Sequence, residues 1–159
     1  MNSTHTADKR LEDLAQHLFD VVTRFCLAVP RSRRRSGELK EIEFLTLSLL
    51  HQHETLIVGE IQRQLGVLPA QMSRIIRALE TRDKPLIACR INPADKRKID
   101  VVLTAEGIEA FKEYQSLRVQ TIATILDKLE ADEREDLDRL VARLRSIARD
   151  PLVVAGMEV

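Results

Sequence analysis

Two short helical patterns, separated by very few residues, limit the folds that this chain can adopt. Val58–Leu65 carries apolar residues one turn apart and runs into Gly66, the residue type that most often ends a helix. Pro69 then suits a first helical position, where its missing N–H has no helical partner to lose, and apolar residues recur at helical spacing up to about Arg82. Two helices joined so closely must pack at a fixed angle, which leaves the outer face of the second helix free.

The segments on either side of this pair predict a further helix before it and a β-hairpin after it. A helix is expected over about Glu38–His53, and Thr55–Val58 is expected to be a short apolar link. The apolar positions that place the helix are Ile42, Leu45 and Leu49, with Phe44 and Leu50 as further candidates. Leu86–Ile91 and Lys98–Leu103 are β-compatible runs, and Asn92–Arg97 between them has the composition of a hairpin turn.

Amphipathic helices are also expected at both ends of the chain. The first runs over about Asp8–Ala28 and ends before Pro30. After the hairpin, Thr104 is a candidate N-cap for a helix that continues to about Glu130, and a last helix opens near Asp132 and ends before Pro151. The predicted fold class is therefore mainly α with a small β-hairpin wing, that is, a winged helix-turn-helix with N- and C-terminal dimerisation helices.

The charge of the chain is zero overall but is unevenly distributed. Residues 31–103 contain 14 Lys and Arg against 9 Asp and Glu, whereas the remainder contains 11 against 16. Such asymmetry favours a basic functional region carried by a neutral or acidic scaffold. The chain also lacks an apolar run of membrane-spanning length and a secretory leader at its start, so it is expected in the cytoplasm with no membrane partner.

The outer face of the second helix of the pair is polar, and the hairpin tip is basic. The helix offers Gln71, Ser73, Arg74 and Arg77, and the tip offers Asp95, Lys96, Arg97 and Lys98. Gln and Arg can read adenine and guanine edges by paired hydrogen bonds in the major groove, so Gln71 and Arg74 are the predicted base-reading residues. Ser73 and Arg77 are better placed for phosphate, and an arginine of the tip can enter a minor groove. These side chains predict binding to double-stranded DNA.

Several short motifs resemble those of the MarR family of transcription regulators. They are Leu65-Gly66, Met72-Ser-Arg74, Leu79-Glu80, Leu86-Ile87, Asn92-Pro-Ala-Asp-Lys-Arg97 and Leu103-Thr-x-x-Gly107. The resemblance covers the chain from about Leu11 to Ile147 and implies a repressor that acts as a homodimer on a pseudo-palindromic operator. It also implies that Arg97 is the minor-groove arginine, that Asp95 holds it in shape, and that a small-molecule effector or an oxidant releases the DNA.

The resemblance implies one domain over residues 1–159. Within it, residues 8–35 and 104–149 are the expected dimerisation helices, and residues 38–103 are the expected winged helix-turn-helix region. The chain departs from the family pattern at three places. Arg82–Pro85 replaces a shorter glycine-containing link, Leu68 stands where a Ser or Thr cap is usual, and Gln62 stands where a small alanine is common.

Other polar residues have both a functional and a structural interpretation. The loop with Arg31, Arg33, Arg34 and Arg35 is either an additional phosphate clamp or a solvated loop. Cys26 and Cys89 are candidates for redox sensing, but a buried, inert thiol is the stronger interpretation for each, with Cys26 facing the core. His51 and His53, with His17 or His5 as further ligands, make only a weak metal site because residues two apart on a helix do not face each other.

Two other classes of function compete with DNA-binding regulation. The same fold serves as a protein-interaction module when the outer face of its second helix is apolar, and here that face is polar. An enzyme is disfavoured because the sequence shows no phosphate-binding glycine loop, HExxH motif or nucleophile elbow, and no cofactor is expected.

Overall fold

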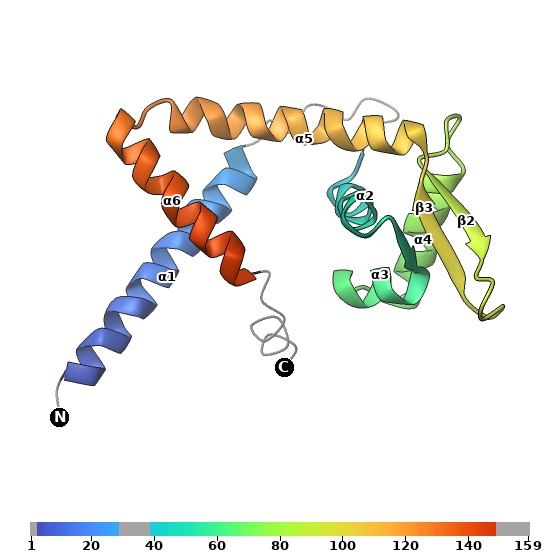
Figure 1. The fold of residues 1–159 in the computed structure, drawn as a ribbon, viewed down its shortest axis with the longest axis horizontal. Helices are drawn as coiled ribbons and strands as arrows, with labels where there is room; N and C mark the ends of the chain where they lie inside the picture. Colours follow the sequence, from blue (N-terminus) through green and yellow to red (C-terminus); the bar gives the residue numbers. More distant parts are fainter. Residues whose placement is uncertain (1–2, 29–38, 149–159) are drawn as a thin grey trace. The chain divides into compact units, whose positions relative to one another are not determined.

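The computed structural model describes residues 3–28 and 39–148. Its helices and strands follow the chain in the order α1, α2, β1, α3, α4, β2, β3, α5 and α6 (Figure 1). The chain divides into two compact units, one formed by residues 1–25 with 119–159 and the other by residues 26–118. The second unit is called the reading head below.

The reading head combines short helices with a small antiparallel sheet. Its helices are α2 (Glu41–His53), α3 (Val58–Leu65), α4 (Pro69–Glu80) and the first part of α5 (Ala105–Leu126). Its strands are β1 (Thr55–Ile57), β2 (Ile87–Ile91) and β3 (Ile99–Leu103), arranged in the order β1-β3-β2. The predicted winged helix-turn-helix is therefore confirmed in its element order.

The strand β1 was not predicted, because Thr55–Val58 was expected to be only a short apolar link. Thr55 pairs with Val102 and Ile57 pairs with Asp100, so the wing is the outer part of a three-stranded sheet rather than an isolated hairpin. A segment of three residues is too short to show strand alternation in a sequence. Its partner lies more than 40 residues away, and only the tertiary fold brings the two together.

The core of the reading head contains apolar side chains from its helices and from its sheet. The largest fully buried ones are Leu47, Leu50, Ile61, Met72, Leu79, Ile87 and Val101. On α2 the predicted inward face was partly wrong, since Leu45 is exposed and Leu47, which was not selected, is fully buried. Two polar residues, Glu43 and Thr46, share the buried face and hide the apolar periodicity. Thr46 is accommodated because its hydroxyl donates to the carbonyl oxygen of Ile42 at 2.8 Å.

Most of the helix ends follow the local chemistry that the sequence predicted. Gly66 ends α3 in the left-handed conformation with φ of 62°, and the Thr104 hydroxyl oxygen accepts the N–H of Gly107 at the start of α5. The predicted end of α4 at Arg82 was two residues too late. The Thr81 hydroxyl donates to the Arg77 carbonyl at 2.7 Å and so satisfies a carbonyl of the last turn.

The other unit contains α1 (Ser3–Ala28), the last part of α5 and α6 (Ala131–Ala148). Each end of its helices lies within five residues of the predicted position. Their apolar stripes are largely exposed to solvent in the single chain, with Leu11, Phe19, Leu140 and Leu144 all at least half exposed. No residue of α6 is buried. These stripes leave a large apolar surface that the described part of one chain does not cover.

Candidate nucleic-acid interface

Helix α4 presents one apolar face to the core and one polar face to solvent. Met72, Ile75 and Leu79 are buried at spacings of three and four. Four side chains that were predicted to contact DNA are all exposed, namely Gln71, Ser73, Arg74 and Arg77. The core thus fixes the orientation of α4, and its base-reading candidates remain accessible.

Ser73 is less available for DNA than expected. Its hydroxyl donates a hydrogen bond to the carbonyl oxygen of Pro69, one turn earlier, at 3.0 Å. Phosphate oxygens only accept hydrogen bonds, and a serine hydroxyl has a single hydrogen to donate. A phosphate contact from Ser73 therefore requires this bond to break.

The turn of the wing is held by Asn92. Its side-chain oxygen accepts the backbone N–H groups of Ala94 and Asp95, both at 2.9 Å, and its side-chain amide donates to Asp100 at 2.8 Å. The N–H of Lys98 donates to the carbonyl of Asp95 at 2.9 Å. The tip is consequently a defined turn, whose asparagine shapes the backbone in the manner that the sequence suggested.

Asp95 and Arg97 make the contact that the family resemblance implied. The backbone N–H and the Nε of Arg97 both donate to Oδ1 of Asp95 at 3.1 Å, and Nζ of Lys98 lies 3.7 Å from Oδ2. The Arg97 side chain, by donating to this carboxylate, holds the pKa of Asp95 below its ordinary value. Arg97 nevertheless stays 91% exposed, so its guanidinium is oriented by Asp95 and still open to a ligand.

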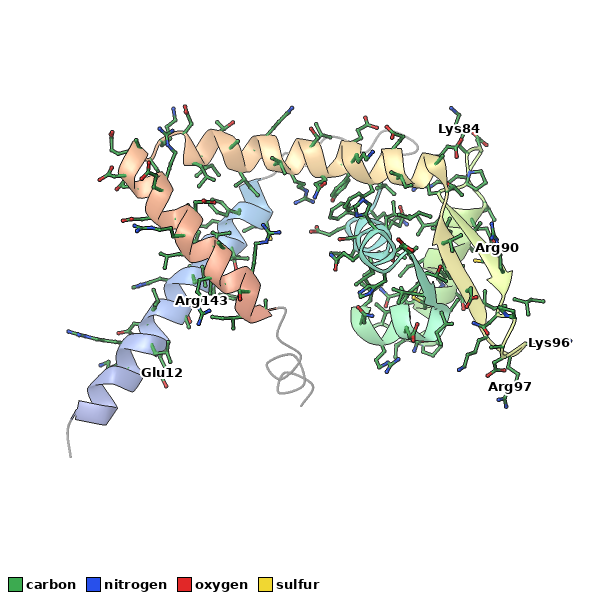
Figure 2. All side chains as sticks on the ribbon, in the orientation of Figure 1. Glu12, Lys84, Arg90, Lys96, Arg97 and Arg143 are labelled. Atoms are coloured by element: carbon green, nitrogen blue, oxygen red, sulfur yellow. The ribbon has the colours of Figure 1, made fainter. Side chains whose placement is uncertain are left out.

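The cations of the wing gather at its tip. Figure 2 shows Lys96 and Arg97 at the turn, whereas Lys84 lies near the opposite end of the hairpin. Lys96, Arg97 and Lys98 are all exposed. The structure thus brings the predicted wing residues together on one short turn.

An ion pair between α2 and the segment after α4 was not predicted. Nη2 of Arg82 lies 2.8 Å from Oε2 of Glu43, and the Glu43 side chain is only 4% exposed. The same Glu43 oxygen accepts the N–H of Lys40 at the start of α2. Arg82 belongs to the longer link that departs from the family pattern, and this contact anchors that link to α2. The two residues lie 39 positions apart in the sequence, and no sequence pattern predicted their pairing.

Stacked aromatic rings join α2 to α5 in the reading head. The ring of Phe44 lies 4.3 Å from that of Tyr114 and 5.4 Å from that of Phe111, measured between centroids. Arg118 donates to the Tyr114 hydroxyl at 2.6 Å. These contacts hold the start of α5 against the helix that precedes the helix-turn-helix, and sequence periodicity alone did not reveal them.

The two cysteines occupy different environments. Burial, together with nearby Glu80, raises the pKa of the Cys89 thiol to about 11, so that it stays protonated at neutral pH and reacts slowly with oxidants. Cys26 is exposed in the single chain, and the expectation that it faces the core was wrong. It lies on α1, whose apolar stripe has no cover within the described residues.

The remaining candidates gain little support. Among residues 3–28 and 39–148, no group of three or more His, Cys, Asp or Glu side chains could hold a metal ion. His51 instead stacks on Phe111 with ring centroids 4.5 Å apart. The loop residues Arg33, Arg34 and Arg35 lie outside the described residues. In the part of the chain that the structure covers, no helix combines the length and the apolar character needed to cross a bilayer.

Comparison with known proteins places this arrangement in a family. Residues 39–99 match the model of the MarR family. Over 143 residues the sequence is 28% identical to the HTH-type transcriptional repressor MdtR of Bacillus subtilis, and the match covers 90% of each chain. The winged helix-turn-helix region of this chain therefore matches the MarR family, and the chain as a whole is similar to repressors of this kind. A further relative, the HTH-type transcriptional repressor Mb2911 of Mycobacterium bovis, is 28% identical over 65% of this chain and 73% of its own.

Solved structures agree with the MarR assignment. The YusO protein of Bacillus subtilis has a TM-score of 0.64 at 28% identity, covering 88% of this chain and 97% of its own. The transcriptional regulator Tm0710 of Thermotoga maritima has a TM-score of 0.68 at 18% identity, covering 86% and 94%, and shows the shared fold. The MarR match and the repressor relatives support a DNA-binding transcription regulator rather than an enzyme.

Proposed function

We propose that this protein is a repressor that binds a pseudo-palindromic operator as a homodimer. Each α4 enters a major groove, and the two wings reach the flanking minor grooves. The observation that carries the proposal is the pairing of an exposed polar face on α4 with the exposed, Asp95-oriented guanidinium of Arg97 on the same reading head. Helix and wing together provide groups for both grooves.

The proposal divides the polar side chains by role. Gln71 and Arg74 lie in the first half of α4, the part of a recognition helix that approaches base edges, and are assigned to base reading. Arg77, Lys96 and Lys98 are assigned to phosphates, which fix the position of the protein on the duplex without reading its sequence. Ser73 joins them only after giving up its bond to Pro69. Arg33, Arg34 and Arg35 remain candidates for additional phosphate contacts.

A second copy of the chain is the partner that best explains the apolar surface of α1 and α6. Leu14 and Leu18 on α1 and Leu140 and Leu144 on α6 are all more than half exposed, although leucine is among the residue types most often buried. Burial of these stripes between two copies removes apolar area from water, which is the main driving force of stable association. The dimer presents two reading heads to one duplex.

Control of binding by a small-molecule effector is part of the proposal because the family resemblance implies it. An effector that prefers one spacing of the two reading heads shifts the population away from the spacing that fits the operator. Release by an oxidant is the weaker form of this control, since Cys89 is held as a thiol and Cys26 is the remaining candidate. The cytoplasm is part of the proposal because a regulator of this kind acts where it meets its DNA target.

The test is selection of bound sequences from a pool of random duplex DNA. The wild-type protein is expected to enrich two inverted half-sites whose centres lie about one helical turn apart. Replacement of Arg74 by alanine should relax the preference at one base pair of each half-site, by about 1–3 kcal/mol per lost bidentate contact. Replacement of Gln71 should do the same at a different base pair.

The matched control for these variants is Arg143→Ala, which removes one exposed positive charge from α6 (Figure 2). This variant should select the wild-type sequence. If Arg74→Ala and Gln71→Ala both rank operator variants as the wild type does, α4 does not read the bases and the assignment is wrong.

A further inference from the structure

Leu68, the residue immediately before α4, exposes an unusually large apolar side chain. It is 73% exposed, and no large apolar side chain of the described residues is more exposed. Leu65 and Val67 in the same turn pack against the core, but Leu68 is not part of that cluster. The turn therefore directs one leucine away from the protein interior at the start of the helix that faces DNA.

Leu68 also occupies the N-cap position without acting as a cap. The N-cap residues of α2 and α3 make no side-chain cap hydrogen bond either, but in those helices and in α6 a first-turn glutamate accepts the N-cap N–H, and Thr104 itself caps α5. Helix α4 has no side-chain cap hydrogen bond and no acidic residue in its first turn. Leucine is among the poorest N-cap residues, whereas Ser, Thr, Asp and Asn stabilise a helix there. Helix stability does not account for the choice of leucine.

The chemistry of the major groove offers a partner for such a side chain. The C5 methyl of thymine is the apolar group that base pairs present in this groove, and protein apolar groups recognise it by contact. Leu68 precedes Gln71 by three residues, so both belong to the end of α4 that approaches base edges. Pro69 and Ala70 between them are exposed and uncharged, so the surface beside Leu68 is also apolar.

We propose that Leu68 is a specificity-determining residue that contacts the methyl group of a thymine in each half-site. This inference rests on the proposed function, because it requires α4 to lie in the major groove of a duplex. It adds an apolar contact to the polar readout by Gln71 and Arg74. It also explains why the cap position of α4 carries a leucine.

The test replaces thymine by deoxyuridine, which lacks only the C5 methyl, at one position at a time in the duplex selected by the wild-type protein. In each half-site, removal of the methyl group at one position is expected to weaken binding about fourfold, as the loss of one buried methyl group predicts. Removal at that position in both half-sites should weaken binding about 15-fold. Leu68→Ser should bind the thymine and deoxyuridine duplexes equally. The same variant gains a helix cap, and its melting temperature should rise by about 2–4 °C.

Leu68→Met is the matched control, because methionine keeps a similar apolar volume and should retain the penalty for deoxyuridine. Equal binding of wild-type protein to every deoxyuridine-substituted duplex overturns the inference and leaves sequence-specific binding intact. An unchanged deoxyuridine penalty in Leu68→Ser also overturns it, since another group must then contact the methyl. If the wild-type protein enriches no sequence at all, the proposed function fails and this inference fails with it.

Discussion

Replacement of Arg97 by alanine is expected to lower the affinity for the selected duplex about 100-fold and to leave the melting temperature unchanged. Two guanidiniums are lost per dimer, and a charge-assisted hydrogen bond contributes about 1.5 kcal/mol or more. Stability is not expected to change because the Arg97 side chain is 91% exposed and such surface ion pairs contribute little. Titration of a labelled duplex and thermal unfolding measure the two effects.

The salt dependence of binding distinguishes a DNA contact from an indirect effect of this substitution. The logarithm of affinity should fall with the logarithm of salt concentration by about 0.9 per neutralised phosphate, and the slope should be shallower in Arg97→Ala. Arg143→Ala removes the same charge from α6 and should change neither the affinity nor the slope appreciably. Wild-type affinity and slope in Arg97→Ala would reject the role assigned to the wing.

Replacement of Gly107 by alanine is expected to destabilise the reading head by about 3 kcal/mol or more, at the upper end of overpacking effects. A Cβ at this position would lie 1.9 Å from the carbonyl oxygen of Leu86 and 2.9 Å from its carbonyl carbon. These are backbone atoms, and the same carbonyl accepts the N–H of Thr104 at 3.1 Å, so neither side yields without breaking a contact. Urea unfolding followed by circular dichroism measures the loss.

Gly59→Ala is the matched control for this substitution. A Cβ on Gly59 would meet nothing within 4 Å, and Gly59 lies inside α3. Alanine should therefore raise the free energy of unfolding by about 0.5–1 kcal/mol, the cost of glycine within a helix. If Gly107→Ala unfolds at the wild-type urea concentration, the close approach of α5 to Leu86 is not a feature of the folded protein.

The same close approach gives a physical reason for the glycine in the Leu103-Thr-x-x-Gly107 motif. The Thr104 hydroxyl donates to the Pro85 carbonyl at 2.6 Å and accepts the N–H of Gly107 at 3.0 Å. One threonine thus caps α5 and ties it to the segment that leads into β2. Only a residue without a side chain permits the backbones to approach so closely.

Local chemistry predicted the parts of the fold that depend on neighbours in the chain. The bounds of Val58–Leu65, the left-handed Gly66, the first-turn Pro69 and the cap at Thr104 all follow from interactions within a few residues. The hairpin bounds were correct to within one residue because its turn and alternation are also local. These elements were therefore accessible from sequence alone.

Contacts between distant segments were not accessible in the same way. The strand β1 exists through its pairing with β3, and Glu43 is buried through its ion pair with Arg82. The buried Glu43 and Thr46 also misled the assignment of the inward face of α2, because a helical pattern assumes that buried positions are apolar. For the candidate site, the sequence identified the candidate side chains of α4 and the wing. It did not reveal that the Ser73 hydroxyl is engaged or that Arg82 anchors the link before the wing.

In the proposed complex, α4 and the wing tip are presented together, twice per assembly, to one double helix. Hydroxyl-radical footprinting of the selected duplex, with the number of bound chains measured by sedimentation, tests this arrangement. We expect two chains per duplex and two related protected regions about 10 base pairs apart, with outer flanks that lose protection in Arg97→Ala. A single protected region with one bound chain, or flanks that Arg97→Ala protects as fully as the wild type, would contradict this arrangement.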